Sequence, residues 1–296
     1  MPQPQSQRGL IDTFLREERL PPDFRETISR WYLPLAEDLL KKANAQPAPL
    51  IVGINGAQGT GKSTLAKFLA LILGLRHVST ATLSLDDFYL DRERRNILAQ
   101  AVHPLLATRG VPGTHDLTLA RRVLQDLTRP DEQVVWLPRF DKGADEPLPT
   151  GEWPQISAPV DLIILEGWFL GAQSQPLSAL QKPVNELEAA EDHDGRWRGY
   201  VNRELEHYQD IFNAIDWLVM LRAPSFDSVY QWRALQEEKL GSRGGGANAP
   251  RVMSAAELRR FVQHFERLTR HCLHSIPPRA DVLFHLNPQH AVTAKE

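Results

Sequence analysis

One glycine-rich stretch, IVGINGAQGTGKST at residues 51–64, constrains the fold of this chain more than any other. The apolar residues up to Ile54 predict a short buried strand, and the glycines that follow let the backbone turn tightly before a helix begins at Lys62. The fixed positions of the pattern G-x-x-x-x-G-K-[ST] are filled by Gly56, Gly61, Lys62 and Ser63. A strand, loop and helix in this order place backbone N–H groups and the positive end of the helix dipole around nucleotide phosphates.

The residues of this phosphate loop have separate predicted tasks. Lys62 reaches the outer phosphates, and the Ser63 hydroxyl ligates Mg²⁺. An ordinary glycine-rich turn is the alternative, but all four fixed positions should occur together by chance in only about a per cent of such chains. We therefore predict nucleotide contacts along the whole loop, from Gly56, Ala57, Gln58, Gly59, Thr60, Gly61, Lys62, Ser63 and Thr64.

Composition favours one α/β domain and excludes several partners. The 296 residues are 42% hydrophobic and 24% charged, and apolar strand patterns alternate with helical ones. A net charge of −3 leaves no basic field to recruit nucleic acid or an anionic membrane. The single cysteine, Cys272, excludes an intramolecular disulfide and a Cys-only zinc site. With no signal peptide or long apolar run, we expect a reduced, soluble, cytoplasmic protein whose oligomeric state the sequence leaves open.

The first 49 residues are predicted to form a helical extension. Residues 1–8 are polar, and we expect them to be disordered. Two stretches with helical spacing follow between residues 11 and 45, and the proline-containing link QPAP separates them from the phosphate-loop strand. No phosphate-handling residues cluster there, so a packing role is favoured over a catalytic one.

Two adjacent acids follow the second predicted strand, at about residues 81–85. Asp86 and Asp87 stand at the carboxyl end of that strand, where open α/β sheets place their ligands. One carboxylate is suited to accept a proton from a substrate hydroxyl, and another to hold metal-bound water. The alternative is that one of them only caps a helix that begins near Asp91.

Two polar loops supply candidates for an acceptor pocket. Arg109, His115 and Asp116 precede a helix at about 117–128, so they either form a small polar pocket or, in the case of Asp116, provide the helix N-cap. A strand at about 133–137, read as buried, leads into a charged loop with Arg139 and Asp141. The planar arginine fork is the better clamp for a carboxylate, so we expect Arg109 or Arg139 to anchor an acidic substrate.

A further acid and a cationic helix complete the candidate site. Glu166 ends the apolar run VDLIILE, where Mg²⁺ needs an oxygen ligand, although a surface glutamate is the alternative. A strand at 216–223 leads into a helix at 225–240 that carries Arg233, and then into GSRGGGANAP. A cationic helix before a flexible loop suits a lid, at about 225–250, that closes over phosphates. A solvated helix with internal salt bridges is the alternative. A helix at 254–274 and a short strand, ADVLFHL, end the pattern.

These pieces together resemble the glycerate kinases of the phosphoribulokinase, uridine kinase and pantothenate kinase group, in particular the D-glycerate 3-kinases and their bacterial relatives. The resemblance spans about residues 50–286, and the first 49 residues carry no matching motif. It depends on the order and spacing of GINGAQGTGKST, LSLDDFYL, RGVPGTHDL, LPRFDKGADEP, LIILEGWFLG, NELEAAEDHDGRWRGYVNREL, QWRALQEEKL and FERLTRHCLHSIPPRAD.

The resemblance implies a P-loop NTPase kinase fold over residues 50–290, with a mostly parallel sheet and helices on both faces. It implies that Asp86, rather than Asp87, is the catalytic base, that Glu166 serves Mg²⁺, and that Arg233 belongs to the lid. It also implies that PGTHD and PRFDK border the acceptor pocket. The catalytic set is then Lys62, Asp86 and Arg233, and the cofactors are ATP and Mg²⁺.

The leading hypothesis is therefore a kinase that phosphorylates D-glycerate. Other acceptors within the group are a nucleoside, pantothenate or a sugar phosphate. A GTPase should carry N-K-x-D, but no Asn of this sequence is followed by Lys, and the L-S-G-G-Q signature of transporter ATPases is also absent. A nucleotide-binding regulator without turnover is less favoured, because Asp86, Glu166 and Arg233 would then share no purpose.

Overall fold

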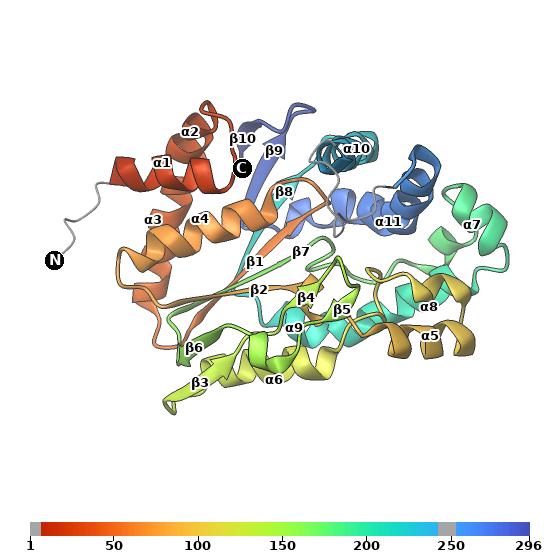
Figure 1. Ribbon diagram of the computed structural model, residues 1–296, viewed down its shortest axis with the longest axis horizontal. Helices are drawn as coiled ribbons and strands as arrows, with labels where there is room; N and C mark the ends of the chain where they lie inside the picture. Colours follow the sequence, from red (N-terminus) through yellow and green to blue (C-terminus); the bar gives the residue numbers. More distant parts are fainter. Residues whose placement is uncertain (1–6, 242–252) are drawn as a thin grey trace.

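The computed structural model describes residues 7–241 and 253–296, which form an α/β fold around one mostly parallel sheet (Figure 1). Over the described residues this sheet has six strands in the order β10-β9-β8-β1-β7-β2. Among them, β10 alone runs antiparallel to its neighbour. The strands are β1 (Leu50–Gly56), β2 (Thr80–Ser84), β7 (Leu162–Gly167), β8 (Trp217–Arg222), β9 (Val282–Leu286) and β10 (Val292–Lys295).

Apolar sequence explains the central place of β1 and β7. All of β7 is buried, and so is β1 except for the partly exposed Ile51. Parallel strands covered on both faces need such near-continuous apolar runs. The register pairs Ile54 of β1 with Glu166 of β7, which brings the start of the phosphate loop level with the acid at the end of the neighbouring strand.

Helices alternate with these strands, as the sequence predicts. The helices expected at 62–75, 117–128, 225–240 and 254–274 are confirmed to within one residue at each end. The one expected at 199–213 starts earlier and is divided by a 3₁₀ segment. The bounds are α1 (Gln7–Glu17), α2 (Phe24–Thr27), α3 (Leu33–Ala45), α4 (Lys62–Gly74), α5 (Arg92–Ala101), α6 (Leu117–Thr128), α7 (Glu186–Glu191), α8 (Arg196–Glu204), α9 (Gln209–Asn213), α10 (Phe226–Gly241) and α11 (Ala255–Ser275).

The N-terminal helices share the core of the sheet domain. Helix α4 lies against β1, β2 and β7, and α3 packs on α4 (Figure 1). The ring of Phe14 lies 5.3 Å from that of Phe68 in α4, and the ring of Tyr32 lies 5.9 Å from it. The expected disorder of residues 1–8 is wrong for Gln7 and Arg8, which begin α1, while residues 1–6 lie outside the described residues. This layer therefore extends the hydrophobic core over the outer face of α4.

The strand expected at 133–137 forms, but its expected burial is wrong. This strand, β3 (Gln133–Trp136), pairs antiparallel with β6 (Gln155–Ala158) in a separate ribbon outside the main sheet. Val134 is 57% exposed and Trp136 39%, because only the opposite face of β3 packs inward. A second small hairpin, β4 (Phe140–Asp141) with β5 (Glu146–Pro147), carries the charged loop after β3.

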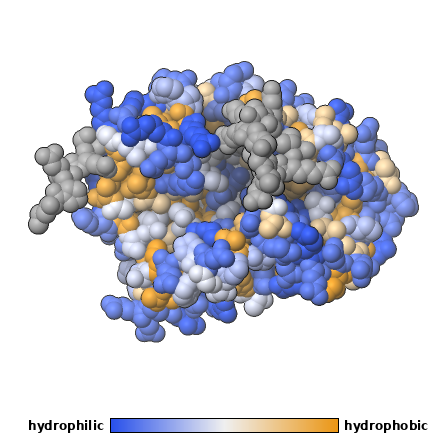
Figure 2. All heavy atoms as spheres, viewed as in Figure 1, coloured by the Kyte–Doolittle hydropathy of each residue, from blue (hydrophilic) through white to orange (hydrophobic). Residues whose placement is uncertain are grey.

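The surface is mostly polar on the face shown in Figure 2, with small and scattered apolar patches. Within the described residues, no helix is both long and apolar enough to cross a lipid bilayer.

Candidate active site

The phosphate loop has the geometry that its glycines predict. Gly59 and Gly61 adopt left-handed backbone angles, with φ of 81° and 92°, and Gly61 is the N-cap of α4. A side chain at Gly56 would put a Cβ only 2.6 Å from the Thr60 hydroxyl oxygen and 2.9 Å from the Leu221 carbonyl oxygen. The loop is therefore closely folded against the end of β8, and its exit points the N-terminus of α4 at the site.

The residues expected to handle phosphate and metal meet at the ends of β1 and β7. The Ser63 hydroxyl donates a hydrogen bond of 2.6 Å to Oε1 of Glu166. The Lys62 ammonium lies 3.9 Å from Oε2 of the same carboxylate and 3.3 Å from the Ala57 carbonyl oxygen. Glu166 is 8% exposed, so the alternative interpretation of this residue as a surface glutamate is wrong.

These oxygens fit Mg²⁺. Magnesium is a hard ion that keeps several waters and takes one or two protein oxygens beside substrate phosphates. A hydroxyl and a carboxylate 2.6 Å apart match that requirement. In the described ranges there is no cluster of three or more His, Cys, Asp or Glu that would cage a metal by itself. Ser63 and Glu166 are thus the residues suited to hold such an ion together with nucleotide phosphates.

The two acids after β2 have different surroundings. They lie in a 3₁₀ turn, η2 (Leu85–Phe88). Asp87 caps this turn, because its Oδ2 accepts the Ser84 N–H at 3.1 Å. Asp86 instead accepts from side chains beyond the turn: the Tyr89 hydroxyl lies 2.7 Å from its Oδ1, and the Lys142 ammonium 2.6 Å from its Oδ2. Neither acid caps the helix that begins near Asp91, because Asp91 itself is the N-cap of α5.

These surroundings shift the pKa values of the two carboxyls in opposite directions. Burial alone would raise the pKa of Asp86, but the Lys142 charge and the hydrogen bonds from Lys142 and Tyr89 outweigh it and hold that pKa below its usual value. Burial raises the pKa of Asp87 to about 6, against the lowering effect of Arg139. At neutral pH Asp86 is therefore the firmly ionised member of the pair.

The raised pKa of Asp87 leads to a testable stability prediction. A carboxyl with a higher pKa in the folded state binds its proton more tightly there, so its contribution to stability is present near pH 4 and is lost as the pH rises through about 6. Relative to Asp87→Asn, the wild-type protein should lose at most about 3 kcal/mol of unfolding free energy between pH 4 and pH 7. Urea denaturation of both proteins without nucleotide measures this; a difference that grows in favour of wild type with rising pH would contradict the assignment.

The loop that carries Arg109, His115 and Asp116 forms one wall beside Asp86. Asp116 is the N-cap of α6, because its carboxylate accepts the Leu119 N–H at 2.9 Å. This confirms the N-cap role that the sequence left open. Asp116 also pairs with Arg94 at 2.7 Å. Arg109 is held by Asp145 and donates to the Lys142 carbonyl oxygen at 3.2 Å. A substrate contact for either residue stays a prediction.

His115 is buried and neutral at the back of this wall. Its ring lies 4.7 Å from that of Tyr89, and its Nδ1 is 2.7 Å from the Tyr208 hydroxyl. Burial lowers the pKa of His115 to about 3. The contacts of Tyr89 with Asp86 and of Tyr208 with His115 were not predicted. Tyr89 follows Asp86 by three residues, so the first contact is local, whereas Tyr208 lies 93 residues from His115.

The β4–β5 hairpin brings the charged loop 138–142 to the acids. Arg139 donates to the Pro138 carbonyl oxygen at 2.7 Å and lies 3.4 Å from Oδ2 of Asp87. Asp141 shapes the hairpin itself, since its Oδ1 accepts the N–H groups of Gly143 and Ala144. The contact of Lys142 with Asp86 was not predicted, although Lys142 belongs to the loop that the sequence marked as charged.

Arg233 lies on α10, and among the described residues it forms no hydrogen bond or ion pair with the phosphate loop. It forms an ion pair with Glu237, one turn further along the helix, and lies 5.8 Å from the Phe261 ring centroid. The internal salt bridge considered as the alternative is therefore present. The glycine-rich part of the predicted lid, 242–250, lies outside the described residues, so closure over phosphate stays a prediction.

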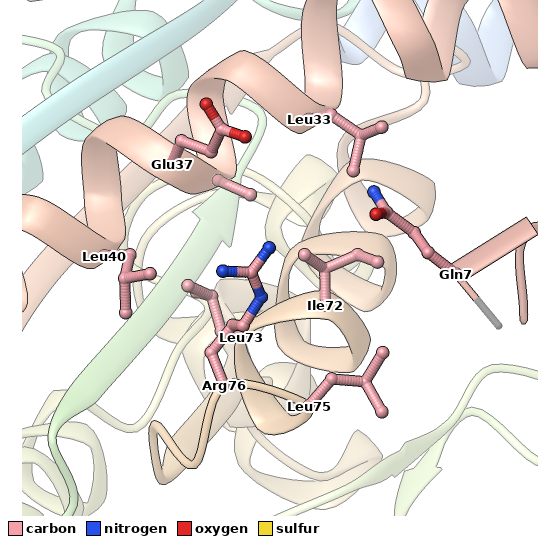
Figure 3. Close-up of a pocket in the computed structure, with 9 residues that line it drawn as sticks. Gln7, Leu33, Glu37, Leu40, Ile72, Leu73, Leu75 and Arg76 are labelled. Atoms are coloured by element: carbon pink, nitrogen blue, oxygen red, sulfur yellow. The ribbon is translucent and has the colours of Figure 1, made fainter. Parts of the chain in front are cut away.

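An apolar cavity of about 60 Å³ lies away from this site, between α3 and the end of α4 (Figure 3). It marks the seam where the N-terminal layer meets α4 and holds no group suited to phosphate chemistry beyond one arginine. Its lining is Gln7, Leu33, Ala36, Glu37, Leu40, Ile72, Leu73, Leu75 and Arg76.

Known proteins resemble this chain in sequence and in fold. No family model matches the chain. The chain is 34% identical over 248 residues to an uncharacterized kinase, Mug58, of Schizosaccharomyces pombe, covering 78% of this chain and 85% of that protein. It is 29% identical over 269 residues to the chloroplastic D-glycerate 3-kinase of Arabidopsis thaliana, covering 85% of this chain but 56% of that protein.

A solved structure agrees with the fold. The D-glycerate 3-kinase of Cryptococcus neoformans superposes with a TM-score of 0.73 at 23% identity, covering 91% of this chain and 98% of that one. This likeness supports the α/β fold with its mostly parallel sheet. The chain belongs to the D-glycerate 3-kinase-like family of P-loop kinases.

Proposed function

We propose that this kinase transfers the γ-phosphoryl group of ATP to a hydroxyl of D-glycerate and requires Mg²⁺. The observation that carries the proposal is the pairing of one ionised carboxylate, Asp86, with the Lys142 ammonium of the β4–β5 hairpin, near Lys62 of the phosphate loop. A small hydroxy acid needs such a combination: an acceptor for the proton of its hydroxyl and a cation for its carboxylate.

The roles of the chain's residues follow from general phosphoryl-transfer chemistry. The loop N–H groups and Lys62 would hold the phosphates. Ser63 and Glu166 would hold the metal, which would supply positive charge to neutralise the phosphates. The acceptor hydroxyl oxygen forms a bond to the γ-phosphorus as the bond to the bridging oxygen of ADP breaks. Asp86 takes the hydroxyl proton in this step. Arg233 is proposed to leave Glu237 and contact the moving phosphoryl group.

Aromatic packing disfavours a nucleoside as the acceptor. A nucleobase would require an exposed ring face for stacking. Three aromatic rings near the site are candidates for such stacking, and all are buried: Tyr89 is 7% exposed, Phe140 9% and Trp168 3%. Tyr89 and Phe140 meet edge to face at 5.3 Å, and the Trp168 indole N–H donates to the Gly110 carbonyl oxygen. Tyr89 and Phe140 thus pack on each other, and Trp168 packs on Phe169 and Phe265, so these rings are used in the core.

An acceptor panel tests the proposal. Purified protein with ATP and Mg²⁺ is offered D-glycerate, uridine, pantothenate and ribulose 5-phosphate, and ADP formation is followed for each. We expect the highest kcat/KM for D-glycerate and no turnover when EDTA removes Mg²⁺. A higher kcat/KM for any other member would overturn the glycerate assignment and leave the kinase family intact.

A further inference from the structure

Lys142 has a backbone that neighbouring residues hold in place and a side chain that is largely exposed. Its carbonyl oxygen is held by Arg109, and Arg109 is in turn paired with Asp145. Asp145 also pairs at 2.7 Å with Arg95, which is 1% exposed and so anchors this part of the hairpin in the protein. The Lys142 side chain, by contrast, is 60% exposed and reaches across to Asp86.

The contact occupies the oxygen that a base must offer. Oδ1 of Asp86 accepts the Tyr89 hydroxyl, and Oδ2 accepts the Lys142 ammonium at 2.6 Å. An ammonium at this position lowers the basicity of the carboxylate and takes the place of an incoming hydroxyl proton. Among the described residues, Asp86 is the one ion-pair partner of Lys142, so breaking the contact would leave both charges in need of new partners.

We infer, on the basis of the proposed function, that Lys142 selects acceptors that carry their own carboxylate. The acceptor carboxylate takes over Lys142, and the acceptor hydroxyl takes the Asp86 oxygen that Lys142 leaves. One ion pair is thereby exchanged for an ion pair and a hydrogen bond. A neutral acceptor cannot make this exchange, because it would break the ion pair between Lys142 and Asp86 and offer the ammonium no carboxylate in return.

The other cations of the site are less free to bind a substrate carboxylate. Arg109 is 23% exposed and already pairs with Asp145, which Arg95 also contacts. Arg139 is occupied by the Pro138 carbonyl oxygen and by Asp87. The carboxylate anchor expected at Arg109 or Arg139 is for this reason better supplied by Lys142.

The first test compares D-glycerate with D-glyceramide, a neutral acceptor of nearly the same shape in which an amide replaces the carboxylate. Lys142→Gln should raise KM for D-glycerate at least about tenfold, leave KM for ATP unchanged, and leave kcat/KM for D-glyceramide equal or higher. Lys142→Arg should keep most of the preference for the acid. The matched control is Lys67→Ala, which removes an exposed lysine of α4 that pairs with Glu18 of the N-terminal layer. Equal losses for both acceptors, or no loss for D-glycerate, would overturn the inference.

The second test uses no acceptor, so it is independent of the proposed substrate. The carboxyl of Asp86 is faced by Lys142, Tyr89, Lys62, Asp87 and His115. In protein labelled with ¹³C at the aspartate carboxyls, the Asp86 resonance is identified as the one that disappears in Asp86→Asn. The pH dependence of this resonance reports the pKa of Asp86, and Lys142→Gln should raise that pKa. An unchanged pKa would show that the ion pair does not form in solution. If the pKa rises but D-glycerate is not phosphorylated, the proposed substrate fails while the pair stands, and the comparison is repeated with the acid that is turned over.

Discussion

Lys62→Ala should lower kcat by at least about a thousandfold while the fold stays intact. The ammonium is the cation that the loop directs at the transferred phosphate. Among the described residues, no other cation forms an ion pair with Glu166. The Lys62 side chain is 11% exposed, but its polar contacts, the Ala57 carbonyl oxygen at 3.3 Å and Glu166 at 3.9 Å, lie at the site rather than in the apolar core, so truncation should leave the core intact. The measurement is steady-state kinetics of the variant together with its thermal unfolding midpoint.

Lys67→Ala provides the matched control for this variant. Lys67 lies five residues further along α4, and it pairs with Glu18 of the N-terminal layer rather than with a residue of the loop. Loss of one exposed ion pair should change stability by about 1 kcal/mol or less and leave kcat unchanged. Normal activity of Lys62→Ala, or an equal loss in Lys67→Ala, would remove the basis for assigning phosphate chemistry to this loop.

Asp86→Asn should lower kcat at least about a hundredfold with little change in KM for ATP. An amide cannot take the proton of the acceptor hydroxyl, but it has nearly the same shape and can still accept the Tyr89 hydroxyl. The nucleotide contacts lie in a different loop, so they should be preserved. Initial rates at varied ATP and varied acceptor separate the two effects.

Asp87→Asn is the natural comparison, because the two acids are neighbours with different tasks. Asp87 holds the Ser84 N–H at the start of η2, so its replacement should affect stability and its pH dependence more than kcat. If Asp87→Asn were the inactive variant and Asp86→Asn active, the general base would have been assigned one residue too early in the chain.

Local sequence was enough to predict the parts of the site that single segments build. The loop from Gly56 to Lys62 is one continuous strand, turn and helix, so its backbone requirements appear directly as glycines. Glu166 was equally predictable, because a fully apolar strand must lie inside the sheet and its last residue must reach the carboxyl edge.

Contacts between distant loops were not predictable in this way. The Lys142 ammonium meets Asp86 across 56 residues, and the Tyr208 hydroxyl meets His115 across 93. No periodicity encodes such pairs, since the packing of separate loops and helices decides them. The same limit explains β3: its alternation of valines and a tryptophan suits a strand, but only the partner strand β6 determines that the ribbon lies outside the main sheet. Strand β10 was missed because it is short and mostly exposed.

The most direct test of phosphoryl transfer to a hydroxy acid is ³¹P NMR of a mixture of the purified protein, ATP, Mg²⁺ and D-glycerate. The account predicts that the γ-phosphate resonance of ATP is replaced in equal amount by a phosphomonoester resonance. Its splitting by neighbouring protons identifies the hydroxyl: a triplet for the terminal CH₂ position and a doublet for the CH position. Asp86→Asn should show neither change over the same time. ATP that is left unconsumed by the wild-type protein, or converted only to ADP and inorganic phosphate, would contradict the account.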